Sequence, residues 1–142
     1  MVISRAAKHD LPAIQYLLAK YGKMTITKDH LNNRDIAVQA RDEGALVGFA
    51  WGGLFANNTI MYIDKVAVDP AYVGNGIVNK MYHFLVHLGI KAGVKQGFGH
   101  IKHDEYHDKA CINALKMSFG SDNAPFTLVY ADAENILKAM GK

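Results

Sequence analysis

The sequence predicts an α/β fold in which helices flank a mixed β-sheet. Three segments carry this prediction. Residues 60–68 are apolar and rich in β-branched side chains, as in a central strand. Residues 77–88 repeat apolar side chains at the 3.6-residue period of a helix that packs one face against a sheet. Residues 97–101 form a further short strand, so the three segments together predict a βαβ unit.

The N-terminal part predicts a strand followed by two helices. Residues 1–6 read as the opening strand, Asp10 as the N-cap of the first helix and Pro12 as a residue of its first turn. Thr27 can cap a shorter second helix that runs toward Arg34. The first helix has one apolar face, formed by Leu11, Ile14, Leu17, Leu18 and Tyr21.

The middle and the end of the chain predict further strands. Residues 36–41 and 45–55 form a hairpin around the turn Asp42-Glu43-Gly44. Glycines at 48, 52 and 53 mark either a bulge or a close approach of another backbone or ligand, and the sequence leaves both open. Residues 127–130 predict a short strand, and Asp132 would cap a closing helix through Met140.

Composition predicts one domain over residues 1–142, because half of the residues are hydrophobic and no linker or repeat divides them. No apolar run approaches the roughly 18 residues of a membrane helix, so no membrane partner is expected. A single cysteine, Cys111, favours a reducing compartment, and we expect a cytoplasmic protein. The net charge of +3 is spread along the chain, so nucleic acid is not an expected partner, although the basic bias suits an anionic cofactor.

A glycine loop joins the 60–68 strand to the helix that follows. Gly74 and Gly76 allow positive φ and let an anion approach the backbone closely. The first N–H groups of the following helix have no intrahelical partner and lie at the positive end of its dipole. The loop therefore predicts a diphosphate site, while the glycine pair taken alone would fit any tight strand-to-helix turn.

These residues resemble the GNAT superfamily of acyl-CoA-dependent N-acyltransferases. The family loop is Gln/Arg-x-x-Gly-x-Gly/Ala, and here it reads Ala71-Tyr72-Val73-Gly74-Asn75-Gly76, with Ala71 in place of Gln or Arg. Val78 stands where a small residue is common. The specific motif covers residues 60–92, and the order of elements agrees over most of the chain.

The resemblance implies a GNAT-like fold, with a mostly antiparallel central sheet, a parallel pair formed by the fourth and fifth strands, and flanking helices. It implies transfer of an acetyl group from acetyl-CoA to a primary amine of a small molecule or protein, by direct attack in a ternary complex. The cofactor-binding residues that it implies are Val66, Ala67, Val68, Val73, Gly74, Asn75, Gly76, Ile77 and Val78.

Asp64 corresponds to an acidic position of the resembling strand and is the candidate base for the acceptor amine. Its alternative role is that of a strand aspartate that pairs with a lysine or faces solvent. The resemblance also implies that the backbone N–H of Val66 or Val68 polarises the thioester carbonyl.

The acid that protonates the leaving thiolate is the largest departure from the family. The family pattern is Asn-x-x-Ala-x-x-Leu-Tyr-x-x-x-Gly-Phe, and alignment on Ala110 and Phe119 puts His107 at the Asn and Ala114 at the Tyr. Tyr106 or Tyr130, His107, or water would then supply the proton. The remaining alternative is a catalytically degenerate GNAT-fold binding or structural protein.

Seven histidines raise the question of a metal, but His83 and His87 lie off the apolar stripe with no Glu between them, so no metal site is expected. In the resembling family the acceptor pocket is walled by the segment that corresponds to residues 21–34. This segment carries Lys23, Lys28 and Arg34, which favours acceptors with a carboxylate or phosphate over polycations. The sequence leaves a monomer and a homodimer both open.

Overall fold

The computed structural model describes residues 1–22, 24–72, 74–102, 118–123 and 126–132. Its strands are β1 (Val2–Arg5), β2 (Ile36–Asp42), β3 (Ala45–Phe55), β4 (Ile60–Val68), β5 (Gln96–Lys102), β6 (Ser118–Asn123) and β7 (Phe126–Asp132). Its α-helices are α1 (Leu11–Leu17) and α2 (Ile77–Ala92). Single helical turns lie at η1 (Lys8–Asp10), η2 (Leu18–Gly22), η3 (Lys28–His30) and η4 (Pro70–Tyr72).

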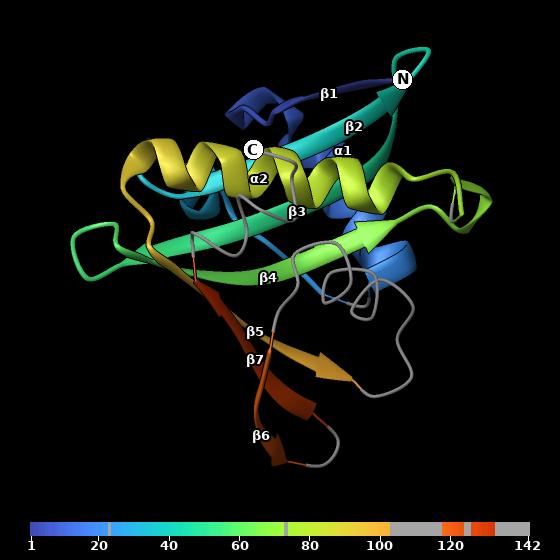
Figure 1. Cartoon of the computed structure of the whole chain (residues 1–142). Helices are drawn as coiled ribbons and strands as arrows, with labels where there is room; N and C mark the ends of the chain where they lie inside the picture. Colours follow the sequence, from blue (N-terminus) through green and yellow to red (C-terminus); the bar gives the residue numbers. More distant parts are fainter. Residues whose placement is uncertain (23, 73, 103–117, 124–125, 133–142) are drawn as a thin grey trace.

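The strands form one mixed sheet in the order β1-β2-β3-β4-β5-β7-β6 (Figure 1). β4 and β5 pair in parallel, and the other neighbouring strands pair antiparallel. Helix α2 makes the crossover between the two parallel strands, as the βαβ prediction required. The mixed, mostly antiparallel sheet with a parallel β4–β5 pair confirms the predicted fold class.

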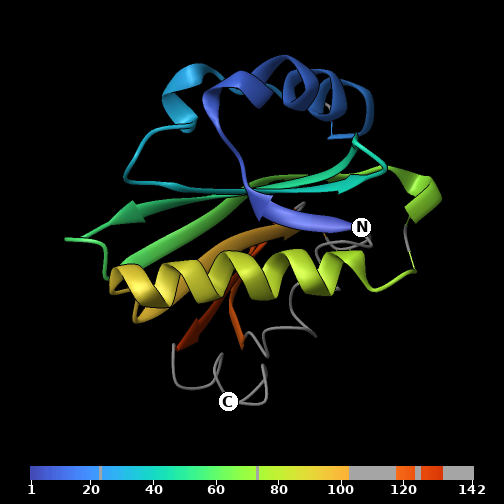
Figure 2. The ribbon, with the colours of Figure 1, turned by 90° about the horizontal axis from the view of Figure 1, so that it is seen from above.

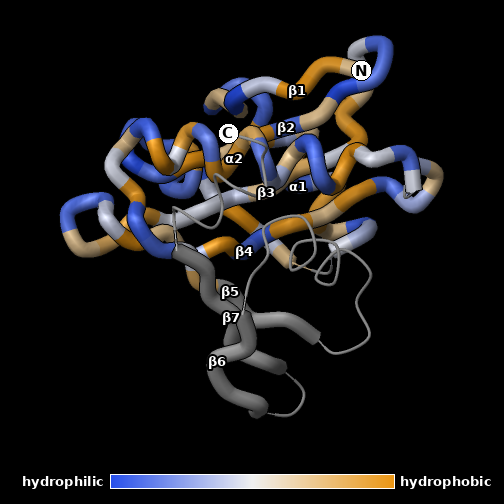
Figure 3. Tube along the Cα trace, viewed as in Figure 1, coloured by the Kyte–Doolittle hydropathy of each residue, from blue (hydrophilic) through white to orange (hydrophobic). Residues whose placement is uncertain are grey.

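Helices cover both faces of the N-terminal part of the sheet, with α1 and η3 on one face and α2 on the other (Figure 2). Each face has its own hydrophobic cluster. The cluster under α2 contains Met61, Met81 and Leu85, and the cluster under α1 contains Ile14 and Phe49. Hydrophobic segments accordingly concentrate in the strands and along α2, while the turn between β3 and β4 is hydrophilic (Figure 3).

Most of the predicted N-terminal elements are confirmed. The hairpin turns at Glu43 and Gly44, and Thr27 Oγ1 accepts a hydrogen bond from the Asp29 amide at 3.3 Å. The second helix is shorter than expected, because only the turn η3 forms. Helix α1 begins at Leu11 as predicted, but the Asp10 carboxylate makes no capping bond to it.

The C-terminal part departs further from the sequence prediction. The strand predicted at 127–130 is confirmed within β7, whereas β6 was not predicted. The expected helical position of Cys111 and the closing helix after Asp132 lie outside the described residues.

Candidate functional site

Strands β4 and β5 separate in the middle of the sheet (Figure 1). Their parallel pairing runs from Ile60 opposite Gln96 to Ile63 opposite Gly99, and β4 then continues to Val68. In the part of the chain that the structure describes, no strand pairs with residues 64–68 on the β5 side. Backbone groups that lack a strand partner can bind an extended ligand that carries amides of its own.

A β-bulge lies where the two strands begin to separate. Trp51 of β3 lies opposite Asp64 and Phe49 opposite Ala67, so Lys65 and Val66 together face Ala50 alone. Lys65 takes up this extra length with a φ of +54°, which is unusual for a residue with a Cβ. A bulge bends the strand that carries it, which accounts for the direction in which β4 leaves β5.

The glycine loop follows β4 and has the backbone conformation expected from its sequence. Gly74 has a φ of +95° and Gly76 a φ of +76°. A Cβ built on either glycine would meet nothing within 4 Å, so the space beside both backbones is open. Glycine is therefore required at both positions by the positive φ, and it keeps the backbone accessible. Collision of a side chain with a neighbouring atom is not the reason.

Helix α2 begins directly after this loop. Gly76 is its N-cap, and the first intrahelical bond runs from the Lys80 amide to the Gly76 carbonyl at 3.1 Å. No acidic side chain lies in the first turn, so the helix itself supplies no carboxylate to occupy the preceding amides. These amides and the helix dipole together favour a bound anion.

Tyr72 ties the start of the loop to the sheet. Its hydroxyl donates a hydrogen bond to Asp42 Oδ2 at 2.7 Å, and its amide donates to the Asp69 carbonyl at 2.9 Å. The hydrogen bond to Asp42 raises the pKa of the Tyr72 hydroxyl, as do burial and the negative charges of Asp42, Asp69 and Glu43. The phenol therefore remains a protonated donor at neutral pH.

Asp64 lies on β4 at the first position beyond the pairing with β5. Its side chain is 44% exposed, and its Oδ2 lies 3.9 Å from Nζ of Lys65. Burial, and secondly the negative charge of Asp64, raise the pKa of the neighbouring Tyr62 hydroxyl. An accessible carboxylate at this position can bind an ammonium ion and accept its proton.

The structure places most of the predicted site residues at the C-terminal end of the central strand β4 and in the loop that follows it. Val66, Ala67 and Val68 lie on the part of β4 that pairs with β3 but has no described strand partner on the β5 side, and Gly74, Asn75 and Gly76 lie in the loop that follows. Ile77 and Val78 are buried, so the groups they can offer a ligand are their backbone amides. Val73, Tyr106, His107 and Ala114 lie outside the described residues.

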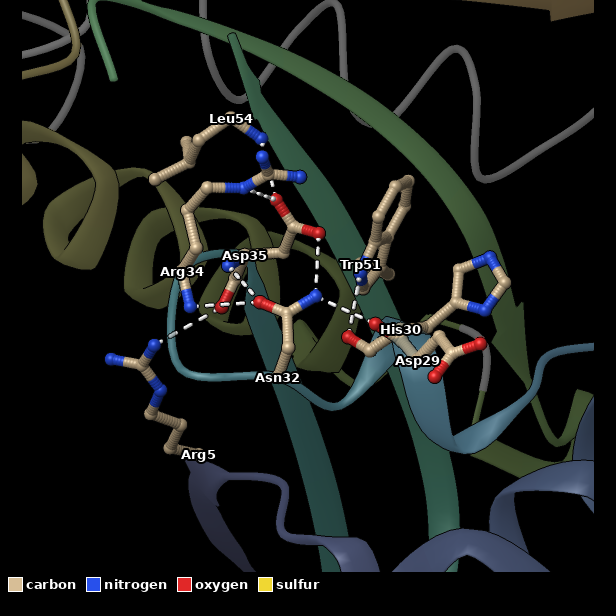
Figure 4. Close-up of polar contacts among 8 residues, drawn as sticks. All are labelled: Arg5, Asp29, His30, Asn32, Arg34, Asp35, Trp51 and Leu54. Carbon is tan, nitrogen blue, oxygen red and sulfur yellow. Dashed lines mark hydrogen bonds and ion pairs between the residues drawn. The ribbon is translucent and has the colours of Figure 1, made fainter. Parts of the chain in front are cut away.

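Sequence reasoning missed a polar network just before β2, centred on the buried carboxylate of Asp35 (Figure 4). Asp35 Oδ1 accepts from the Leu54 amide at 2.9 Å, and Oδ2 accepts from Asn32 Nδ2 at 2.9 Å. Arg34 Nε donates to Oδ1 at 3.3 Å. Burial raises the pKa of the Asp35 carboxyl, but these hydrogen bonds outweigh it and hold the pKa below its ordinary value.

The same network positions the segment that precedes β2. Asn32 Oδ1 accepts from the Arg34 and Asp35 amides, and Asn32 Nδ2 also donates to the Asp29 carbonyl. The indole N–H of Trp51 donates to the His30 carbonyl at 2.9 Å (Figure 4). The spacing Asn32-x-x-Asp35 was the available sequence signal, because Asn side chains commonly bond to backbone amides that follow them.

Within the described ranges, no group of three or more His, Cys, Asp or Glu side chains is arranged to hold a metal ion. None of the helices in those ranges is long and apolar enough to cross a membrane.

A sequence model of the Acetyltransferase (GNAT) family matches residues 7–119. No curated protein sequence matches the chain at a significant level. Among solved structures, the chain is similar to the ribosomal-protein-S18-alanine N-acetyltransferase from Escherichia coli, with a TM-score of 0.78, 16% identity and 93% of each chain covered. At such low identity the likeness concerns the fold.

Two further similar structures are complexes with coenzyme A or with acetyl-CoA. One is an aminoglycoside 6'-N-acetyltransferase complexed with coenzyme A, with a TM-score of 0.78, 15% identity, and 94% of this chain and 97% of that chain covered. The other is a phosphinothricin acetyltransferase from Sinorhizobium meliloti in complex with acetyl-CoA, with a TM-score of 0.75, 17% identity, and 92% of this chain and 87% of that chain covered.

Proposed function

The chain belongs to the GNAT acetyltransferase family, and on this premise we propose that it transfers an acetyl group from acetyl-CoA to a primary amine. The observation that carries the proposal is the separation of β4 from β5 directly before a glycine loop and a helix N-terminus. This arrangement offers unpaired backbone amides to an extended arm and an anion site to a diphosphate. Acetyl-CoA contains both groups.

The cofactor would bind along β4 and then turn into the loop. Val66, Ala67 and Val68 would pair with the amides of the pantetheine arm, and the amides of residues 73–78 would bind the pyrophosphate. The Asn75 amide would exchange its 3.4 Å hydrogen bond to the Tyr72 carbonyl for one to the ligand. The similar structures that contain coenzyme A or acetyl-CoA support this cofactor. Ala71, in place of the Gln or Arg of the family loop, leaves the backbone amides as the main source of affinity.

The amine would attack the thioester directly in a ternary complex. Asp64 would accept the ammonium proton, either directly or through water, and the freed lone pair would form the new C–N bond. The N–H of Val66 or Val68 would stabilise the carbonyl oxygen as its negative charge develops. The nitrogen of this intermediate loses its second proton to water as the C–S bond breaks, and the departing thiolate takes a proton from Tyr106, from Tyr130, from His107 or from water.

A degenerate protein that keeps the fold and binds ligands without turnover is the second candidate. The observation that favours it is Ala114 at the position where the family has its Tyr acid. A missing acid costs about 10²–10⁴ in rate, which lowers activity without abolishing it. Preservation of Gly74, Gly76 and Asp64 favours the enzyme. One domain over residues 1–142 and a cytoplasmic location stay predictions.

Calorimetric titration tests the cofactor, with acetyl-CoA, coenzyme A and ATP as parallel ligands. Micromolar binding of the two coenzyme A species and weak binding of ATP would support the proposal. Release of free coenzyme A thiol in the presence of an amine panel then separates the enzyme from the degenerate protein. Absence of acetyl-CoA binding would overturn the proposal, because the loop would then be architectural.

A further inference from the structure

Aromatic side chains from three strands lie on the α1 side of the sheet. Gly52 and Met61 face α2, since a Cβ on Gly52 would meet Met61 and Leu85. Successive residues of a strand alternate between faces, and cross-strand partners share one. The opposite face therefore carries the side chains that we call the aromatic face, which are Trp51 and Phe55 of β3, Tyr62 of β4 and Phe98 of β5.

The strand pairing places the residues of the aromatic face next to one another. Tyr62 lies opposite Gly53 on one side and opposite Phe98 on the other. Gly53 leaves room for rings, because a Cβ there would lie 2.7 Å from Cη2 of Trp51 and 3.3 Å from Cε2 of Phe55. Trp51 and Phe55 thus meet over the Gly53 backbone, and the four residues form one continuous apolar strip.

The strip is held in place by neighbouring residues and is accessible to solvent. The indole of Trp51 is fixed by its bond to the His30 carbonyl and by an edge contact with the His30 imidazole at 5.0 Å between ring centroids. Phe55 is 53% exposed, and Trp51, Tyr62 and Phe98 are partly buried. A rigid aromatic surface that stays open to solvent suits a flat apolar ligand group.

Asp64 lies at one end of this strip, directly opposite Trp51. Two residues along a strand span about 7 Å, so the carboxylate lies about that distance from the Tyr62 position. An ammonium group two or three bonds away from an aromatic ring would match this spacing. Such a cation would also gain from the faces of nearby aromatic rings.

We propose that the acceptor is an aromatic monoamine, whose ring lies on the aromatic face and whose ammonium group binds Asp64. The acetyl-transfer step rests on the proposed function, whereas the amine site rests on the strand register and the side chains alone. The basic segment before β2 bears less on this site than the sequence suggested, because the Arg34 guanidinium is paired with Asp35. A polycation would pair one of its charges with Asp64, but its aliphatic chain would lack the ring-on-ring contact that an aromatic amine makes with the strip.

Trp51 allows binding to be followed directly by fluorescence, because it is the single tryptophan of the chain. Its fluorescence would be titrated with four probes, with and without bound coenzyme A. These are 2-phenylethylamine, the saturated ring analogue 2-cyclohexylethylamine, the uncharged analogue 2-phenylethanol, and spermidine. We expect 2-phenylethylamine to bind about threefold or more tighter than the saturated analogue, as aromatic contacts contribute beyond their area. We expect loss of the ammonium charge to weaken binding by about tenfold or more.

Variants separate the ring contact from the charge contact. Phe55→Ala should remove the preference for the aromatic over the saturated ring, and Asp64→Asn should weaken the two ring amines, 2-phenylethylamine and 2-cyclohexylethylamine, alike. Tyr16→Ala is the matched control, since Tyr16 is a 67% exposed aromatic residue of α1. It should leave all four affinities unchanged.

The outcomes also separate this inference from the proposed function. Binding of 2-phenylethylamine without binding of acetyl-CoA would support the amine site and overturn the acetyl transfer. Acetylation of spermidine or of an aliphatic amine, with equal affinity for both ring analogues, would support the enzyme and overturn the aromatic acceptor. An unchanged preference in Phe55→Ala would overturn it as well.

Discussion

The hydroxyl of Tyr72 lies 2.7 Å from Oδ2 of Asp42 and donates a hydrogen bond to it. The two residues belong to different parts of the fold, since Asp42 ends β2 and Tyr72 ends the turn that leads into the glycine loop. The bond crosses 30 positions of sequence and connects the first hairpin to the start of the loop. It fixes the N-terminal end of the glycine loop, while α2 begins at the C-terminal end.

Tyr72→Phe should weaken acetyl-CoA binding, because the loop loses this tie and must be ordered when the cofactor binds. We expect an increase in Kd of less than about tenfold, the range of one hydrogen bond. Calorimetry measures it, and Tyr21→Phe is the control on the other side of the sheet. A larger loss in the control would contradict this role for Tyr72.

Gly76→Ala should weaken acetyl-CoA binding far more than Gly44→Ala. Both glycines have positive φ, +76° and +84°, and neither has an atom within 4 Å of a built Cβ. Each substitution should therefore destabilise the fold by a similar amount, about 1–2 kcal/mol. Only Gly76 adjoins the amides proposed to bind pyrophosphate. Chemical unfolding and calorimetry on both variants separate the two effects, and equal binding losses would contradict the anion site.

Asp64→Asn should reduce kcat/KM by about 10²–10⁴ while the Kd for acetyl-CoA stays unchanged. The physical reason is that the amide cannot accept the ammonium proton. Turnover by the variant should rise with pH, because a growing fraction of the amine is then already neutral. Steady-state kinetics across pH measures this, with Asp29→Asn as a control in a nearby exposed turn. A variant with the wild-type pH profile would remove Asp64 from the proton path.

Asp35→Asn should lower the free energy of unfolding by about 1.5–3 kcal/mol at neutral pH, as expected for buried charge-assisted hydrogen bonds. The native pKa of Asp35 lies below its ordinary value of 3.8. The unfolded chain therefore takes up the proton first as pH falls. The stabilisation is complete well above pH 3.8 and is lost as pH drops through the native pKa.

The difference in the free energy of unfolding between wild type and Asp35→Asn should consequently shrink as pH falls below 3.8. Urea unfolding at several pH values measures it, and Asp29→Asn again serves as the control. A constant difference across this range would mean that the carboxylate charge is not what stabilises the segment.

Local sequence patterns were sufficient to predict those parts of the structure in which backbone geometry depends on a few adjacent residues. Gly44 marked the hairpin, and Gly74 and Gly76 marked the turn into α2, because only certain residues accept those dihedral angles. Strand β4 and the buried face of α2 followed from β-branched content and helical period. These features together gave the predicted sheet and the place of the candidate site.

Features that depend on tertiary contacts were not predicted. Asp10 was expected to cap α1, but its carboxylate instead accepts from the Ala7 amide and from Arg41, 31 positions away. The bulge at Lys65 has no local signal, because lysine does not favour positive φ and the register of β3 imposes it. Strand β6 has little β-branched content and forms through its pairing with β7.

The separation of β4 from β5 also sets how the two parts of the sheet are joined. Among the described residues, four pairs of the β4–β5 ladder carry the strand pairing between the first four strands and the last three. A pantetheine arm paired with residues 66–68 would act as an additional short strand along this seam. Cofactor binding would then extend the strand pairing between the two parts of the sheet and slow amide hydrogen exchange in β5 as well as in β4. The ligand would thus reversibly stabilise the sheet itself.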